Sequence, residues 1–137
     1  MIRDGSDLVE NLTVFENEFF NVSLNLYPYN PGHVILFPLR HVEDLRDLTE
    51  AEQRDFTKIL GITLDVIEQE YSPTGINYGC NMGLDAGASI AHLHFHVIPR
   101  YPRETGIADL IAGQRVLVEN PIDTLRKLKA RFSRSCN

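Results

Sequence analysis

The segment "SIAHLHFHVIPR", residues 89–100, carries three of the chain's five histidines, with one apolar residue in each gap between them. Side chains on a β-strand point alternately to the two faces of a sheet. The alternation predicts a strand over residues 92–98 whose core-facing positions are Leu93, Phe95 and Val97. The opposite face carries His92, His94 and His96. Because a sheet needs no imidazole for its stability, three on one face indicate a functional surface.

Two kinds of chemistry use such a surface, metal binding and catalysis. At a rise of ~3.3 Å per residue, His92 and His96 lie about 13 Å apart along a strand, so one tetrahedral zinc ion does not take all three rings. A metal site would use two of them with ligands from elsewhere, and the segment offers no carboxylate or cysteine. Catalysis uses all three, with a reactive central imidazole between two that bind and orient. The spacing favours catalysis, and a metal-dependent site is the alternative.

The composition is that of one globular domain over residues 1–137, because 43% of the residues are apolar and 23% are charged. The net charge of −6 argues against a nucleic-acid partner, since phosphate backbones bind basic faces. A small anionic substrate is compatible with this charge where positive groups gather locally.

Two cysteines, Cys80 and Cys136, are too few for a disulfide framework and favour a reducing compartment. The opening "MIRDGSDLVE" has neither the basic nor the apolar region of a signal peptide. No apolar run approaches the ~20 residues of a membrane span. We therefore expect a soluble, cytoplasmic protein that does not associate with membranes.

Strand and turn signals predict a β-hairpin in the first third of the chain. The stretches 19–27 and 33–39 are rich in β-branched and aromatic residues, and "YPYNPG" at 27–32 is a turn signal. Pro38 is expected to end the second strand. Further strands are predicted over 76–83 and 92–98, and a short strand or coil over 114–119.

Two helices are predicted, over residues 50–71 and 120–132. Six residues of the first, all apolar except Thr63, recur at helical spacing on one face: Phe56, Ile59, Leu60, Thr63, Val66 and Ile67. The residues at the helix starts fit capping roles, with Thr49 and Glu52 as a capping box and Asn120 and Pro121 as N-cap and first helical residue. Two helices against an antiparallel sheet define an α+β fold.

The triad "HLHFHVI" resembles the signature of the histidine triad (HIT) family of nucleotidyl hydrolases and transferases. "NLYPYNPGHVILFPLRHVEDL" at 25–45 is similar to the family's fragile-histidine and dinucleoside polyphosphate hydrolase or phosphorylase branches, and "NMGLDAGAS" at 81–89 to the loop before the triad. The resemblance implies a HIT-like fold with an antiparallel sheet of about five strands and two main helices. It also implies a small-molecule nucleotide substrate, no cofactor, and a homodimer of joined sheets, with the helix over 50–71 and the strand over 76–83 as interface candidates.

The resemblance implies catalytic roles at matching positions. His94 matches the nucleophile, whose Nε2 would attack the α-phosphorus of a nucleotide and form a nucleotidyl-histidine intermediate while a backbone carbonyl holds the other ring nitrogen. His96 matches the histidine that contacts phosphate oxygens. His92 matches the one that orients the set together with His33 of the hairpin. Ser89 matches a hydroxyl that donates to the leaving group.

Four further positions match substrate-contacting residues: Asn25 and Asn81 for ribose or phosphate, and Gly83 and Gly87 for a loop backbone that approaches phosphate closely. His41 has no assigned role. Three arginines near these blocks are candidates for local positive potential: Arg40, Arg100 and Arg103.

Departures from the family pattern leave the branch open. Ala88 stands where some branches carry glutamine, and "SIAH" lacks the acidic residue of many polyphosphate phosphorylases. This spacing is closer to the hydrolase and phosphoramidase branches, whereas "NLYPYNPGH" is closer to the phosphorylases. The cysteine pair that binds zinc in some relatives is missing, so structural zinc is not expected.

The predicted activity is cleavage at the α-phosphate of a dinucleoside polyphosphate or a nucleoside phosphoramidate. Two alternatives remain, a nucleotide-binding or partner-binding module with little turnover and a metal-dependent hydrolase.

Overall fold

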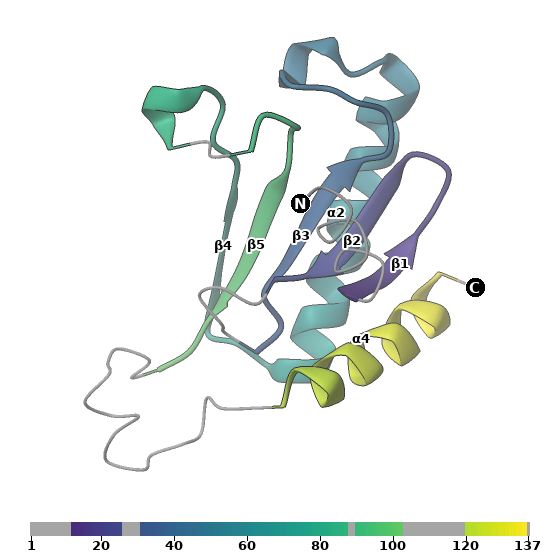
Figure 1. The fold of residues 1–137 in the computed structure, drawn as a ribbon. Helices are drawn as coiled ribbons and strands as arrows, with labels where there is room; N and C mark the ends of the chain where they lie inside the picture. The colour runs from purple at the N-terminus through teal and green to yellow at the C-terminus, as the bar shows by residue number, and fades with distance from the viewer. Residues whose placement is uncertain (1–11, 26–30, 88–89, 103–119, 137) are drawn as a thin grey trace.

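The computed structural model describes residues 12–25, 31–87, 90–102 and 120–136, whose strands form a five-stranded antiparallel sheet in the order β1-β2-β3-β5-β4 (Figure 1). The strands are β1 (Thr13–Glu16), β2 (Phe20–Leu24), β3 (Val34–Pro38), β4 (Gly75–Gly79) and β5 (Phe95–Arg100). The helices are α2 (Glu50–Tyr71) and α4 (Pro121–Ser135), with short 3-10 turns η1 (Leu45–Asp47) and η2 (Leu84–Ala86). The α+β class predicted from the sequence is confirmed.

The predicted hairpin is formed by β2 and β3, and Pro38 is the last residue of β3, as expected. The first edge strand, β1, lies outside the predicted elements. Its four residues are too few to show an alternation, and its pairing with β2 is irregular between Thr13 and Phe15. Phe15 stacks on Phe132 of α4, with ring centroids 5.4 Å apart, so packing stabilises a strand that its own sequence does not reveal.

The strand that carries the histidines begins later than predicted, because β5 starts at Phe95 and both His92 and His94 precede it. The ladder with β3 reaches only to the level of Phe95, so the residues before it have no strand partner there. Leu93 instead donates its N–H to the carbonyl oxygen of Val42 at 2.7 Å. The predicted alternation of burial nevertheless holds, since the three apolar positions are buried and the three histidines are half-buried.

The second edge strand, β4, is shorter than the predicted stretch of 76–83. It ends at Gly79 opposite His96, one residue short of the start of β5, and residues 80–83 lead into η2. Its side chains are mostly exposed, and Tyr78 keeps 62% of its surface. Among the described strands, this edge of the sheet has no further neighbour.

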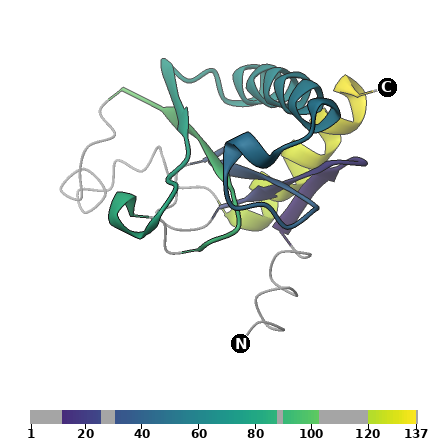
Figure 2. The ribbon, with the colours of Figure 1, turned by 90° about the horizontal axis from the view of Figure 1, so that it is seen from above.

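The helices form a second layer. Figures 1 and 2 show α2 along one side of the sheet, while α4 packs against α2 and β1. The predicted capping box and the Asn120 N-cap are both present. Phe56 of α2 lies against Phe20 and Phe95, at centroid distances of 5.6 and 4.4 Å. Because side chains alternate along β5, His96 faces away from this helix.

No helix among the described residues combines the length and the apolar character that a membrane crossing requires. The short strand or coil predicted over 114–119 lies outside the described residues, as do Ser89 and Arg103.

The first turn of α2 contains a buried carboxylate. Glu52 is 4% exposed and accepts hydrogen bonds from Arg40 Nε at 3.1 Å, Arg40 Nη2 at 2.8 Å and the Thr49 N–H at 2.8 Å. The Arg40 hydrogen bond is the largest cause that lowers the pKa of Glu52 from 4.5 to about 2. The pair therefore stabilises the start of the helix as long as the carboxyl group is ionised.

We expect Glu52→Gln to lower the free energy of unfolding by about 1–2 kcal/mol at neutral pH. A lowered folded-state pKa adds stability above the unfolded value, so this contribution is complete above pH 4.5 and is lost as the pH falls toward 2. The difference in melting temperature between variant and unchanged protein should therefore narrow in acid. Glu50→Gln is the matched control, because Glu50 is 90% exposed. If the melting-temperature difference between Glu52→Gln and the unchanged protein stays constant down to about pH 3, the lowered pKa of Glu52 is contradicted.

Candidate active site

His94 lies immediately before β5 and is half-buried. Its Nδ1 is 2.9 Å from the carbonyl oxygen of His92. A carbonyl oxygen only accepts, so Nδ1 carries the proton and the neutral ring has its lone pair on Nε2. Within the described part of the chain Nε2 makes no hydrogen bond. The geometry therefore presents an unprotonated ring nitrogen that can act as a nucleophile.

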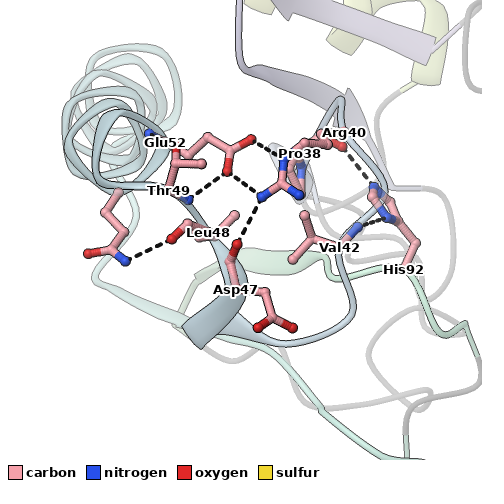
Figure 3. A network of polar contacts seen from close by, with 9 residues as sticks. Pro38, Arg40, Val42, Asp47, Leu48, Thr49, Glu52 and His92 are labelled. Atoms are coloured by element: carbon pink, nitrogen blue, oxygen red, sulfur yellow. Dashed lines mark hydrogen bonds and ion pairs between the residues drawn. The ribbon is translucent and has the colours of Figure 1, made fainter.

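His92 is held on both ring nitrogens by backbone groups at the end of β3 and just after it (Figure 3). Its Nε2 donates to the carbonyl oxygen of Pro38 at 2.7 Å, and its Nδ1 accepts the N–H of Val42 at 3.3 Å. The His41 ring stacks on it, with centroids 5.3 Å apart and planes 20° from parallel. Because both nitrogens are engaged, His92 acts on His94 through its carbonyl and not through its ring.

A second set of hydrogen bonds joins the hairpin to β5. Asn25 Nδ2 lies 3.3 Å from His33 Nδ1, and His33 Nε2 lies 3.2 Å from His96 Nδ1. An amide nitrogen only donates, so His33 accepts at Nδ1 and donates from Nε2 to His96. The proton of a neutral His96 is then on Nε2, where it can be donated to a ligand oxygen. The His94 and His96 rings lie edge to face, with centroids 5.3 Å apart.

These contacts pair the predicted site residues differently from the expectation. The resemblance places His33 with His92, whereas in the structure His33 bonds to His96, and His92 bonds to backbone groups of Pro38 and Val42. Asn25, expected at the substrate, contacts His33. His41, which had no assigned role, stacks on His92. No spacing in the sequence indicates that stack, because it depends on the path of the chain beyond β3.

The environment of His96 favours its neutral form. Burial is the largest cause that lowers its pKa below the ordinary 6.5, and the charge of a protonated His94 is the second. A lowered folded-state pKa means that the unfolded chain takes up the proton first. Stability from this residue is therefore complete above pH 6.5 and is lost as the pH falls through the folded-state pKa.

We expect an NMR titration of the ring protons to give His96 a pKa below its ordinary value. In His94→Asn this pKa should rise, because the neighbouring charge is removed, but it should stay below the ordinary value because the ring is still buried. A pKa at or above 6.5 in the unchanged protein would contradict the assignment.

The loop before the triad exposes the residues that the resemblance assigns to substrate. Gly83 and Gly87 flank η2 with φ angles of 92° and 94°, which residues with side chains rarely adopt. Asn81 lies beside the second glycine, since a Cβ on Gly87 would be 3.6 Å from Asn81 Nδ2. All three are exposed and accessible to a ligand. The positive φ angles thus favour glycine at both positions, in addition to the expected close approach of the loop backbone to phosphate.

The arginine that ends the hairpin does not offer free positive charge. The guanidinium of Arg40 binds both carboxylate oxygens of Glu52 and the carbonyl oxygen of Asp47 (Figure 3). Its charge is therefore offset by a buried carboxylate. This contact joins Arg40, a candidate for substrate binding, to Glu52 of the helix cap.

Among residues 12–25, 31–87, 90–102 and 120–136, no group of three or more His, Cys, Asp or Glu side chains is placed to hold a metal ion. The two ring nitrogens of His92 are bonded to backbone atoms, so the H-x-H pair of His92 and His94 does not form a chelating pair in this arrangement. The geometry fits a reactive imidazole better than a metal ligand set.

An α+β fold with one histidine in β5, two more just before it and a fourth at the hairpin defines the class of histidine triad proteins. The chain belongs to the HIT family, whose HIT domain matches residues 9–103. It is 38% identical over 126 residues to a protein of Mycobacterium tuberculosis named AP-4-A phosphorylase, over 91% of this chain and 65% of that protein. It is 38% identical over 105 residues to the bis(5'-adenosyl)-triphosphatase of Saccharomyces cerevisiae, over 76% of this chain and 50% of that protein.

A Hit-like protein of Bartonella henselae, described as involved in cell-cycle regulation, has the same fold, with a TM-score of 0.71 at 19% identity over 93% of this chain and 94% of that one. The family and the HIT-like fold expected from the sequence are thus confirmed. The chain spans only 65% and 50% of the length of the two curated relatives.

Proposed function

We propose that this protein is a nucleotidyl hydrolase or transferase that cleaves at the α-phosphate of a nucleotide conjugate through an intermediate on His94. The observation that carries the proposal is the hydrogen bond from His94 Nδ1 to the His92 carbonyl, because it leaves the lone pair on Nε2. The names of the two relatives favour dinucleoside polyphosphates as the substrate class.

In the first step, Nε2 of His94 forms a bond to the α-phosphorus, and the bond from phosphorus to the bridging oxygen breaks. The leaving phosphate takes the electron pair. Nδ1 keeps its proton, and the carbonyl oxygen of His92 stabilises the positive charge that develops on the ring. In the second step, water or inorganic phosphate attacks the phosphorus and the electron pair of the N–P bond returns to Nε2. Attack by water, which loses a proton to the solvent, gives the nucleoside monophosphate, and attack by phosphate gives the diphosphate.

His96 binds the reacting phosphate in this proposal. Its Nε2–H donates to a non-bridging oxygen, while His33 and Asn25 hold the ring by the relay to Nδ1. Ser89 donates to the leaving oxygen, as the family resemblance implies. The loop contacts ribose and phosphate through Asn81, Gly83 and Gly87.

Incubation with diadenosine tetraphosphate and with adenosine phosphoramidate, followed by chromatography, tests the proposal. Hydrolysis should give AMP and ATP from the first substrate, and AMP and ammonia from the second. If ADP replaces AMP when inorganic phosphate is added, the enzyme is a phosphorylase. A folded protein that releases none of these nucleotides would contradict the proposal.

We also propose that two chains join at the β4 edge into a homodimer. This edge has no neighbour among the described strands, and the hollow between it and α2 is lined in part by Leu64, Pro73 and Ile76. Open edges and apolar surface favour association of identical chains. Analytical ultracentrifugation should give twice the 15.6 kDa of one chain, and Tyr78→Lys should reduce the dimer. A monomer at all concentrations would contradict this proposal.

A cytoplasmic location of the protein stays a prediction.

A further inference from the structure

The segment from β3 to α2 is fastened by Arg40 (Figure 3). The guanidinium reaches forward to the first turn of α2, where Nε and Nη2 bind the two carboxylate oxygens of Glu52 at 3.1 and 2.8 Å. Nη2 also donates to the carbonyl oxygen of Asp47 at 2.8 Å. A planar guanidinium held at two oxygens and a carbonyl has a defined orientation, which a lysine does not reproduce. Arg40 therefore sets the position of its own backbone relative to α2.

The backbone on either side of Arg40 holds the turn of residues 92–94 that precedes β5. Two residues before it, the carbonyl oxygen of Pro38 accepts from His92 Nε2 at 2.7 Å. Two residues after it, Val42 donates its N–H to His92 Nδ1 at 3.3 Å and accepts the Leu93 N–H at 2.7 Å. All three hydrogen bonds to the turn are thus made by backbone groups of Pro38 and Val42, each two residues from Arg40.

The same turn orients the nucleophile. The His92 carbonyl accepts the hydrogen bond from His94 Nδ1 at 2.9 Å, so the direction of the His94 ring depends on the rotation of the His92 peptide group. We propose that the Arg40–Glu52 pair is a positioning device, which fixes the 38–42 backbone on α2, holds the His92 turn and thereby aims the lone pair of His94. This inference rests on the proposed role of His94, and Arg40 itself contacts no reacting atom in it.

A second arginine on the same segment supplies a matched control. Arg46 pairs with Asp44 at 2.6 Å, but its side chain is 85% exposed, and its bonds stay within η1 and its cap. Arg40→Gln and Arg46→Gln remove the same charge from the same segment. Only the first releases the backbone that holds His92.

Steady-state kinetics with diadenosine tetraphosphate give the first readout. Arg40→Gln should lower kcat about 10- to 100-fold with KM changed less than about threefold, because a misaimed nucleophile impairs the reaction more than binding. Arg40→Lys, which keeps the charge but not the fork, should fall between Arg40→Gln and the unchanged protein. Arg46→Gln should stay within about twofold of the unchanged protein. Equal losses in the two glutamine variants, or none in Arg40→Gln, would overturn the proposal.

Ring nitrogen shifts in protein labelled with ¹⁵N-histidine give a readout that does not need turnover. At about pH 8, where free imidazole is neutral, the unchanged protein should show His92 protonated at Nε2 and His94 at Nδ1. In Arg40→Gln, whose folding is checked by its melting temperature, both rings should shift toward a mixture of tautomers. If Arg40→Gln does not fold, Arg40→Lys takes its place, and its two rings should show a smaller shift in the same direction. Unchanged tautomers in the Arg40 variants would overturn the proposal. Shifted tautomers in a protein whose unchanged form has no turnover would support the positioning and overturn the proposed function instead.

Discussion

His94→Asn is expected to lower kcat/KM for diadenosine tetraphosphate by at least about 10⁴-fold, because it removes the atom that forms the covalent intermediate in the proposed mechanism. Asparagine fits the space but has no ring nitrogen with a lone pair where Nε2 lies. Substrate affinity should change by less than about threefold, since the phosphate contacts of His96 and the loop remain. Steady-state kinetics and calorimetric titration with a slowly cleaved analogue measure the two quantities.

Mass spectrometry of reactions quenched in alkaline denaturant adds a direct check, because the N–P bond of a nucleotidyl-histidine survives base and is hydrolysed in acid. A peptide that contains His94 should carry the mass of one AMP in the unchanged protein and should lack it in His94→Asn. His41→Asn is the control. The His41 ring stacks on His92, but its one hydrogen-bond partner among the described residues is the exposed Glu43, and we expect the variant to lower activity less than about fivefold. If His94→Asn keeps more than about a hundredth of the activity, His94 is not the nucleophile.

The features that the sequence predicted correctly are those determined over a few residues. The capping box of α2 joins Thr49 to Glu52, and the N-cap of α4 is one side chain reaching two residues ahead. The hairpin follows from strand propensity around one turn signal. The alternation through the triad also held, because burial of Leu93 fixes the sides to which its neighbours point even before the strand begins.

The features that the sequence did not predict depend on contacts between distant residues. His33 meets His96 across 63 positions, and His92 meets Pro38 across 54. These pairings follow from the order of the strands, with β5 between β3 and β4, and no local pattern states that order. The start of β5 was placed too early for the same reason, since it depends on where the β3 ladder ends. Resemblance to the HIT family supplied the candidate site residues, but not the hydrogen bonds among them.

Phe95→Ala is expected to lower the free energy of unfolding by about 3–5 kcal/mol, out of the ~5–15 kcal/mol that a domain of this size has. Phe95 is the first residue of β5 and is 5% exposed. Its ring lies 4.4 Å from that of Phe56, so truncation leaves a cavity between the sheet and α2. The two neighbours of this residue are His94 and His96. Any settling of the strand into that cavity would therefore move His94, the proposed nucleophile, relative to His96, the proposed hydrogen-bond donor to the phosphate.

Urea unfolding followed by circular dichroism measures the loss of stability, and kinetics well below the melting temperature measure the effect on the site. Phe95→Leu is the matched control, because it keeps most of the apolar volume and should cost less than about 1.5 kcal/mol. We expect Phe95→Ala to lower kcat even in the fraction that stays folded, whereas Phe95→Leu should retain most of it. A loss below about 1 kcal/mol for Phe95→Ala would show that this ring does not anchor β5 to α2, and the apolar face of the triad segment would then not be what aims its histidines.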